Sequence, residues 1–145
     1  MVHDVPDALR ATWGTDAAIN QGELYAAPLT VSSVPELLEG EDVLWWIDNT
    51  SAEAALVKAG SPTESMCDIA LAATAALAGL RCRPWFDHVP SPDNPADALS
   101  RDGLEDETVR RRIACGAYVV REAVEPPRNS ILDYEYWWRR QYDVA

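Results

Sequence analysis

With 145 residues, 48% of them hydrophobic, the chain is long enough for one domain with a core and too short for two domains of ordinary size. No apolar run approaches the ~20 residues of a membrane span, and the N-terminus lacks the pattern of a secretory signal. We therefore expect an intracellular protein, cytoplasmic or nuclear, that is neither secreted nor membrane-bound. The net charge of −12 argues against strong autonomous binding to nucleic acid, because basic side chains supply most of the affinity for phosphates.

Residues 19–38 place apolar side chains close to one face of a helix, but Pro28 interrupts the pattern. Proline in a helix interior costs ~3 kcal/mol or more, so the segment is predicted to kink near residues 24–28 or to split into two helices. Ser33 lies shortly before Pro35, and this order predicts a new helix start there.

The run VLWWI at residues 43–47 is apolar throughout, with charged residues on both sides. A short run of β-branched and aromatic residues without polar alternation predicts a strand covered on both faces. The pattern after it predicts a helix that is capped by Thr50 or Ser51 and ends at Gly60.

Residues 61–79 predict a second, alanine-rich helix that packs against a sheet. Its expected inward-facing residues are Met66, Ile69, Ala70, Ala73 and Leu77. Residues 81–89 alternate loosely, and Pro84 makes them an edge strand. The apolar positions of this loose alternation are Cys82, Trp85 and Val89. A short helix over 96–104 follows a proline-rich loop and ends at Gly103.

We divide the chain into a weakly determined segment (1–18), a core (19–104) and a C-terminal part (105–145). The first carries one helical signal, Leu9 and Trp13 four residues apart. The last predicts a helix over 105–122 and then a cluster that either stacks on bases or packs onto a domain. This aromatic and basic cluster comprises Tyr134, Tyr136, Trp137, Trp138, Arg139 and Arg140.

The alternation of strands and helices predicts an α/β fold, which places Asp48 at the carboxyl end of a strand, where open sheets gather functional groups. A carboxylate there is stable when it is solvated, caps the next helix or is neutralised by a cation. Capping by Asp48 or Asn49 is thus an open alternative to a metal site. Two further acids lie at comparable points: Glu23 in the helix before the strand, and Asp97 in the first turn of the short helix.

Cysteine and histidine chemistry offers little here. The three cysteines are widely spaced and form no CxxC pair, which argues against a disulfide framework or a zinc site. Of the two histidines, only His88 is a candidate base for a catalytic triad, and no nucleophile motif lies near it. We expect these thiols to be incidental.

The three acids look like the metal-binding set of the ribonuclease H-like (RNase H-like) fold, and the surrounding sequence extends the likeness. The stretches WIDNTSAEAALVKAG and WFDHVPSPDNPADALSR resemble the RNase H-like region of reverse-transcribing retroelements, notably tyrosine-recombinase-type retrotransposons. The resemblance covers roughly Val5 to Leu104, and Glu23 is matched mainly by its order and distance. It implies a mixed sheet flanked by helices.

The resemblance also implies a function, cleavage of the RNA strand in RNA–DNA hybrids. Glu23, Asp48 and Asp97 would then hold two Mg²⁺ or Mn²⁺ ions, which activate a water and stabilise the leaving oxygen of a phosphodiester. Four further residues of the matching stretches would contact the substrate: Asn49, Ser51, Asn94 and Arg101.

One feature of the family has no counterpart in this sequence. The family's site also uses an aspartate on the first strand of the sheet, upstream of the glutamate helix, whereas only 22 residues precede Glu23. Asp4 and Asp7 lie in proline-containing sequence that does not read as a strand. We therefore expect that the first strands are missing and that the nuclease is incomplete or inactive unless an upstream aspartate is supplied. A sheet edge would then be open to a polypeptide that supplies strands.

Three hypotheses follow. The first is an RNase H-like retroelement domain descended from a two-metal nuclease. The second is a non-catalytic module of the same fold that binds nucleic acid or protein. The third is an unrelated small α/β protein in which the acids are helix caps.

Overall fold

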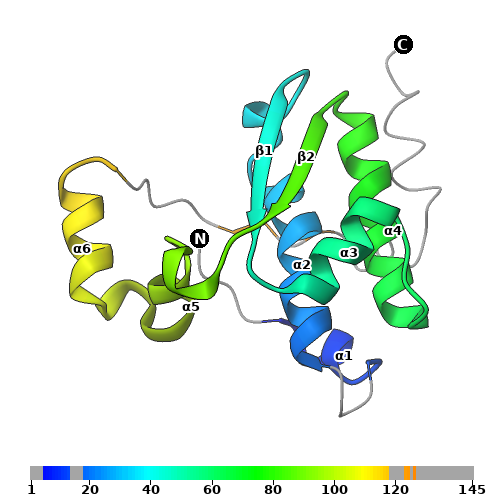
Figure 1. The fold of residues 1–145 in the computed structure, drawn as a ribbon, viewed down its shortest axis with the longest axis horizontal. Coiled ribbons are helices and arrows are strands. Elements are labelled where there is room, and N and C mark those ends of the chain that lie inside the picture. The colour runs from blue at the N-terminus through cyan, green and yellow to red at the C-terminus, as the bar shows by residue number, and fades with distance from the viewer. Residues whose placement is uncertain (1–4, 14–17, 118–122, 125, 127–145) are drawn as a thin grey trace.

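The computed structural model describes residues 5–13, 18–117, 123–124 and 126 (Figure 1). Its sheet consists of two parallel strands, β1 (Asp42–Ile47) and β2 (Arg83–His88). Their register places Asp42 opposite Arg83 and Ile47 opposite His88. The α/β class is confirmed, and β2 is an edge strand, as Pro84 predicted. Two parallel strands do not by themselves identify an RNase H-like fold.

The helix before the sheet, α2 (Ala18–Ser33), runs without interruption through Pro28. The predicted split into two helices is wrong. Proline leaves the carbonyl of Leu24 without its usual helical donor, but Pro28 is fully buried, and the packing of this apolar ring offsets part of that loss. The new helix start is a single 3₁₀ turn, η1 (Pro35–Leu37), without a side-chain cap, and the Ser33 hydroxyl donates to the Leu29 carbonyl instead.

Two helices follow β1, namely α3 (Thr50–Lys58) and α4 (Glu64–Gly79). All five apolar residues predicted for the inner face of α4 are buried. The helix α3 ends through Ala59, which adopts the left-handed conformation that was expected of Gly60. The Gly60 N–H donates to the carbonyl of Ala55, which closes this end of the helix.

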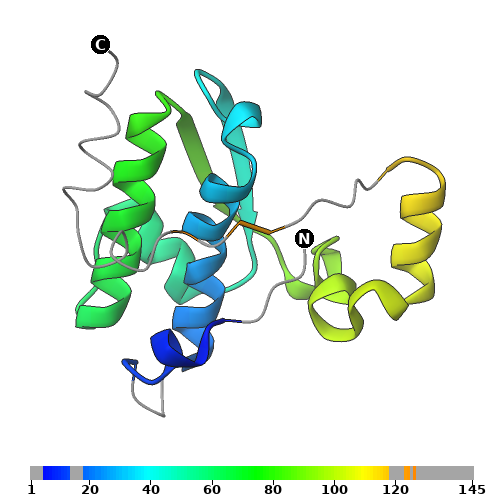
Figure 2. The same ribbon diagram turned by 180° about the vertical axis from the view of Figure 1, so that it is seen from behind.

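The helices α2 and α4 cover one face of the sheet, and α3 lies at its carboxyl end (Figures 1 and 2). On the covered face, the core contains four side chains of the strands, from Val43, Trp45, Ile47 and Phe86. The rings of Trp45 and Phe86 lie 5.9 Å apart, centroid to centroid. Small alanine side chains on α4 let this helix approach the strands closely.

The opposite face of the sheet is open, so the prediction of a strand covered on both faces is wrong. Leu44 and Trp46 are 54% and 51% exposed, and Trp85 on the neighbouring strand is 69% exposed. The burial of β1 alternates residue by residue, as the two-residue period of a strand requires when one face is covered. Composition alone concealed this, because the outward residues are as apolar as the inward ones.

The remaining elements are short. The helix α1 (Asp7–Arg10) precedes Trp13, which is buried, and whose ring centroid lies 6.3 Å from that of Tyr25. After β2 come η2 (Ser91–Asp93), α5 (Asp97–Asp102), η3 (Gly103–Glu105) and α6 (Glu107–Ala114).

The helix predicted over 105–122 is shorter in the structure, because α6 begins after its cap Asp106 and ends at Ala114, before Gly116 with its positive φ of 76°. Residues 118–122 and the aromatic and basic cluster lie outside the described residues. The helix α6 extends away from the sheet (Figure 1).

Candidate acidic site at the carboxyl end of the sheet

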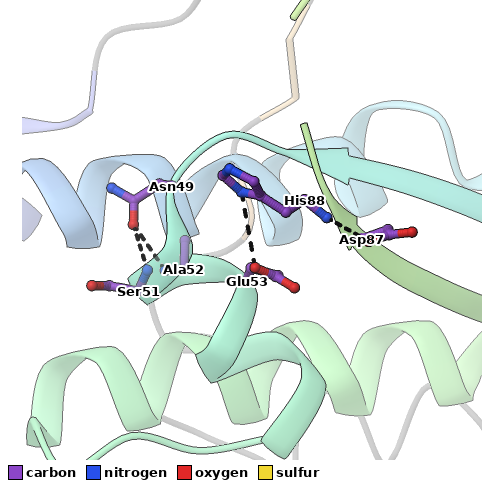
Figure 3. A network of polar contacts seen from close by, with 6 residues as sticks. All are labelled: Asn49, Ser51, Ala52, Glu53, Asp87 and His88. Carbon is purple, nitrogen blue, oxygen red and sulfur yellow. Dashed lines mark hydrogen bonds and ion pairs between the residues drawn. The ribbon is translucent and has the colours of Figure 1, made fainter. Parts of the chain in front are cut away.

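The turn after β1 separates the roles of Asp48 and Asn49. The Asn49 side-chain oxygen accepts hydrogen bonds from the backbone N–H groups of Ser51 (3.0 Å) and Ala52 (2.9 Å), which caps α3 (Figure 3). Neither Thr50 nor Ser51 is the cap, contrary to the prediction. Among the described residues, none donates a hydrogen bond to the half-buried Asp48 carboxylate. Asp48 is therefore not needed to begin the helix.

The other end of the Asn49 side chain ties this turn to the preceding helix. Its amide nitrogen donates to the side-chain oxygen of Asn20 on α2, at 3.0 Å. Asn20 lies one helical turn before Glu23, and residues three apart share a helix face. This hydrogen bond thus holds the glutamate-bearing face of α2 near the turn that carries Asp48.

The pKa of Glu23 responds to the other two predicted acids. Partial burial raises the pKa of Glu23 above its ordinary value of 4.5, and the negative charges of Asp48 and then Asp97 raise it further. Glu23 is exposed, so solvent screens this repulsion. The three carboxylates come from a helix, the end of a strand and the start of a later helix.

Asp97 differs from the other two acids in having a basic neighbour. It occupies the first turn of α5, as predicted, and its carboxylate lies 3.1 Å from the guanidinium of Arg101, one turn later. The Arg101 side chain is 68% exposed, so the ion pair is open to water and weak. Among the described residues, neither Glu23 nor Asp48 forms an ion pair with a basic side chain.

The donor chemistry of these three residues fits a divalent cation, since Mg²⁺ and Mn²⁺ prefer carboxylate oxygens. The side chains are, however, too far apart to bind one ion together. Within the described part of the chain, no group of three or more Asp, Glu, His or Cys side chains lies close enough to hold a metal ion as the side chains stand. A cation would have to draw the three carboxylates together.

Of the four residues predicted to contact substrate, Asn49 and Asn94 lie in the segments that follow β1 and β2, and Ser51 and Arg101 lie in α3 and α5. Both polar atoms of the Asn49 side chain already bond within the chain, so its role is at least partly structural. Asn94 is similar, because its side-chain oxygen accepts the N–H of Ala96 at 2.9 Å. Ser51 lies exposed in the first turn of α3, and Arg101 is the ion-pair partner described above.

The structure adds a pair of residues that the sequence did not reveal. His88, the last residue of β2, lies with its Nδ1 atom 4.0 Å from the carboxylate of Glu53 on α3 (Figure 3). Glu53 lies in the first turn of α3, where the helix dipole favours a negative charge. The parallel register is the signal that joins them, because it places His88 opposite Ile47, just before the turn into α3.

Cys67, Cys82 and Cys115 are free cysteines, and of the three only Cys82 is buried. Burial raises the pKa of the Cys82 thiol, which keeps it protonated and unreactive.

Comparisons with family models, with curated proteins and with solved structures give no match to this chain. In the described residues, no helix is both long enough and apolar enough to cross a membrane.

Proposed function

We propose that this chain is an RNase H-like domain of the retroelement type, whose acidic site binds divalent cations and, through them, the backbone of an RNA–DNA hybrid. One observation carries the proposal: at the carboxyl end of the sheet, the negative charges of Asp48 and Asp97 contribute to the raised pKa of Glu23. The order of the elements that supply them supports it: a helix with the glutamate, a strand that ends in an aspartate, and a later helix that begins with the second aspartate.

The cost of this arrangement is the reason to expect a cation. Like charges that approach one another raise a carboxyl pKa and destabilise the folded state near neutral pH. Asn49 performs the capping, so Asp48 is not retained for that purpose. A bound cation would turn the repulsion into attraction, and it would also let a protein of net charge −12 approach phosphates.

The residues have separate roles in this proposal. Glu23, Asp48 and Asp97 would hold the cations, which when bound supply activation of a water and charge stabilisation at the scissile phosphate. The Asn20–Asn49 hydrogen bond positions two of the three ligands relative to each other. Arg101, at the edge of the site, offers an exposed guanidinium to a backbone phosphate.

A second candidate is binding without cleavage, the non-catalytic module. The loose spacing of the acids favours it, because phosphodiester cleavage by two metals requires ions ~4 Å apart and closely fixed ligands. The two candidates share the metal site and differ in the reaction.

The test is a Mg²⁺ titration of the urea-unfolding free energy of the full chain, beside Asp48→Asn and the control Asp42→Asn at the opposite end of the sheet. Saturation at 100 times the dissociation constant should stabilise the wild type by about 2.7 kcal/mol. Asp48→Asn should lose most of this gain and Asp42→Asn should keep it. Equal gains in all three proteins would rule out the site.

Activity is measured separately, with a labelled RNA–DNA hybrid and Mn²⁺. Cleavage that Asp48→Asn abolishes supports the nuclease. Stabilisation by metal without any cleavage supports the non-catalytic module and rejects a nuclease activity for this chain.

A further inference from the structure

The two outer edges of the sheet differ in their backbone hydrogen-bonding groups. The N–H of Arg83 donates to the carbonyl of Glu41 (2.9 Å), and the N–H of Val89 donates to that of Ile47 (3.0 Å). In a parallel ladder, alternate residues of a strand direct both backbone groups toward the same neighbour. The odd-numbered residues of β1 therefore face β2, and the even-numbered ones direct their N–H and C=O groups toward the outer edge. These even-numbered residues are Asp42, Leu44 and Trp46.

The outer edge of β2 is poorly suited to pairing. By the same alternation, its outward groups belong to Pro84, Phe86 and His88. Proline has no N–H, and the N–H of His88 donates to the carboxylate of Asp87 at 2.8 Å. Proline and local side-chain hydrogen bonds are means by which natural sheets protect an edge.

The outer edge of β1 has neither protection. It contains no proline, and in the described part of the chain no third strand pairs with it. Leu44 and Trp46, which alternate along it, present apolar side chains that are more than half exposed. An unprotected edge with an exposed apolar row is a template for an added strand.

Charge at the two ends of this edge indicates what kind of strand would fit. Glu41 and Asp42 lie at the start of β1, where Asp42 is already paired with Arg83, and Asp48 follows its end. A second copy of this chain fits poorly, because antiparallel pairing of two β1 edges would bring Asp42 of one copy toward Asp48 of the other. The net charge of −12 on each copy adds to this repulsion.

We propose that the outer edge of β1 binds an extended segment of another polypeptide, which adds a strand to the sheet. The segment carries apolar residues that alternate along its centre, beside Leu44 and Trp46, and basic residues at both ends. Backbone hydrogen bonds to Asp42, Leu44 and Trp46 hold it in place. This partner site borders the proposed metal site, since Asp48 follows the end of the edge, but the backbone hydrogen bonds of the added strand do not require a cation.

The probe is a short synthetic peptide with lysine at both ends and alternating valine and threonine between them, added to the full chain in EDTA. Amide hydrogen exchange by NMR reports on the edge. We expect saturating peptide to slow exchange at Leu44 and Trp46 by about tenfold or more, because these amides gain hydrogen bonds. A second peptide carries N-methyl groups on alternate residues, so that one of its two edges has lost its N–H donors. This peptide should bind only through its other edge, which retains them. A peptide that is N-methylated at every residue should not bind.

Two matched variants separate the edge from the exposed face. Trp46→Lys and Trp85→Lys each remove an exposed tryptophan from the same face, but only Trp46 borders the added strand. Trp46→Lys should weaken the peptide by about tenfold, through lost contact and charge repulsion, and Trp85→Lys should change it little.

Three outcomes would overturn this proposal. One is unchanged exchange at Leu44 and Trp46 in saturating peptide, and another is equal weakening by the two variants. The third is slow exchange of these amides in the chain without peptide, together with a measured mass that corresponds to a dimer. That result would make a second copy the occupant of the edge. If Trp46→Lys fails to fold, the N-methylated peptide on the wild-type chain still decides.

Discussion

The two ends of the parallel sheet treat their acidic side chains in opposite ways. At the amino end, Asp42 accepts a hydrogen bond from Arg83 directly across the strands, and this bond and the positive charge lower the pKa of Asp42. At the carboxyl end, Glu23 has two acids as its charged neighbours, and its pKa is raised. The same sheet thus compensates its acids where they are exposed and brings them together where its strands end.

The contrast bears on function because the fold does not require it. An acid at a strand terminus can be paired with an arginine across the sheet, as Asp42 is. An arrangement that brings acids together costs stability, and such costs gather at sites of binding or catalysis. The carboxyl end is therefore the better place to look for chemistry.

The largest expected effect comes from the residue that organises the carboxyl end. Asn49→Ala removes the cap of α3 and the hydrogen bond to Asn20, so we expect a loss of about 1–2 kcal/mol in the free energy of unfolding, measured in urea. Arg83→Ala, at the amino end, breaks only a fully exposed ion pair and should cost less.

Asn49→Asp is the control for this first prediction. Aspartate caps a helix about as well as asparagine, but it cannot donate to Asn20. Its loss should be smaller than that of Asn49→Ala. Equal losses in the two variants would mean that the lost hydrogen bond to Asn20, together with repulsion between the new carboxylate and Asp48, cancels the retained cap.

Much of this end of the sheet was predictable from sequence because it depends on local signals. An apolar run that ends in Asp48, and a proline-rich loop before Asp97, place both acids at element boundaries without knowledge of the fold. The inner face of α4 was equally predictable, since its apolar residues follow the helical period over 16 residues.

The rest depends on contacts between distant residues. Capping of α3 by Asn49 was one of the alternatives that the sequence offered, but the hydrogen bond from Asn49 to Asn20, 29 positions away, has no local signal. The continuous helix through Pro28 likewise reflects tertiary packing that overrides a local penalty. The open face of β1 was hidden because Leu44 and Trp46 are as apolar as their buried neighbours.

A smaller effect is expected when one acid at each end of the sheet is neutralised, and the change in stability should have opposite signs at the two ends. In EDTA at neutral pH, Asp48→Asn relieves repulsion on Glu23, and we expect it to stabilise the chain by about 0.5 kcal/mol, a value reduced for solvent screening. Asp42→Asn removes an ion pair and should destabilise the chain. Urea unfolding of both variants measures the comparison, and destabilisation by Asp48→Asn in the absence of metal would contradict it.

The smallest effect is the titration of Glu23 itself. Its pKa should lie above the ordinary value of 4.5, and Asp48→Asn should lower it more than Asp97→Asn, because Asp48 contributes more to the shift. Carboxyl ¹³C NMR over a pH series measures this directly. A Glu23 pKa at or below 4.5 in the wild-type chain would mean that the three carboxylates do not share a field.

The same shift carries a definite sign for stability. Below pH 4.5, Glu23 is protonated in both the folded and the unfolded chain. As the pH rises through 4.5 and then through the raised folded pKa, the unfolded chain releases its proton first, so the folded chain binds more protons and its stability falls. Glu23→Gln removes this group. The unfolding free energy of the wild type should therefore fall relative to that of the variant across this pH window, and the difference should become constant above it. Saturating Mg²⁺ should reverse the shift if the cation binds where the acids meet, because the metal favours the ionised carboxylate that repulsion disfavours.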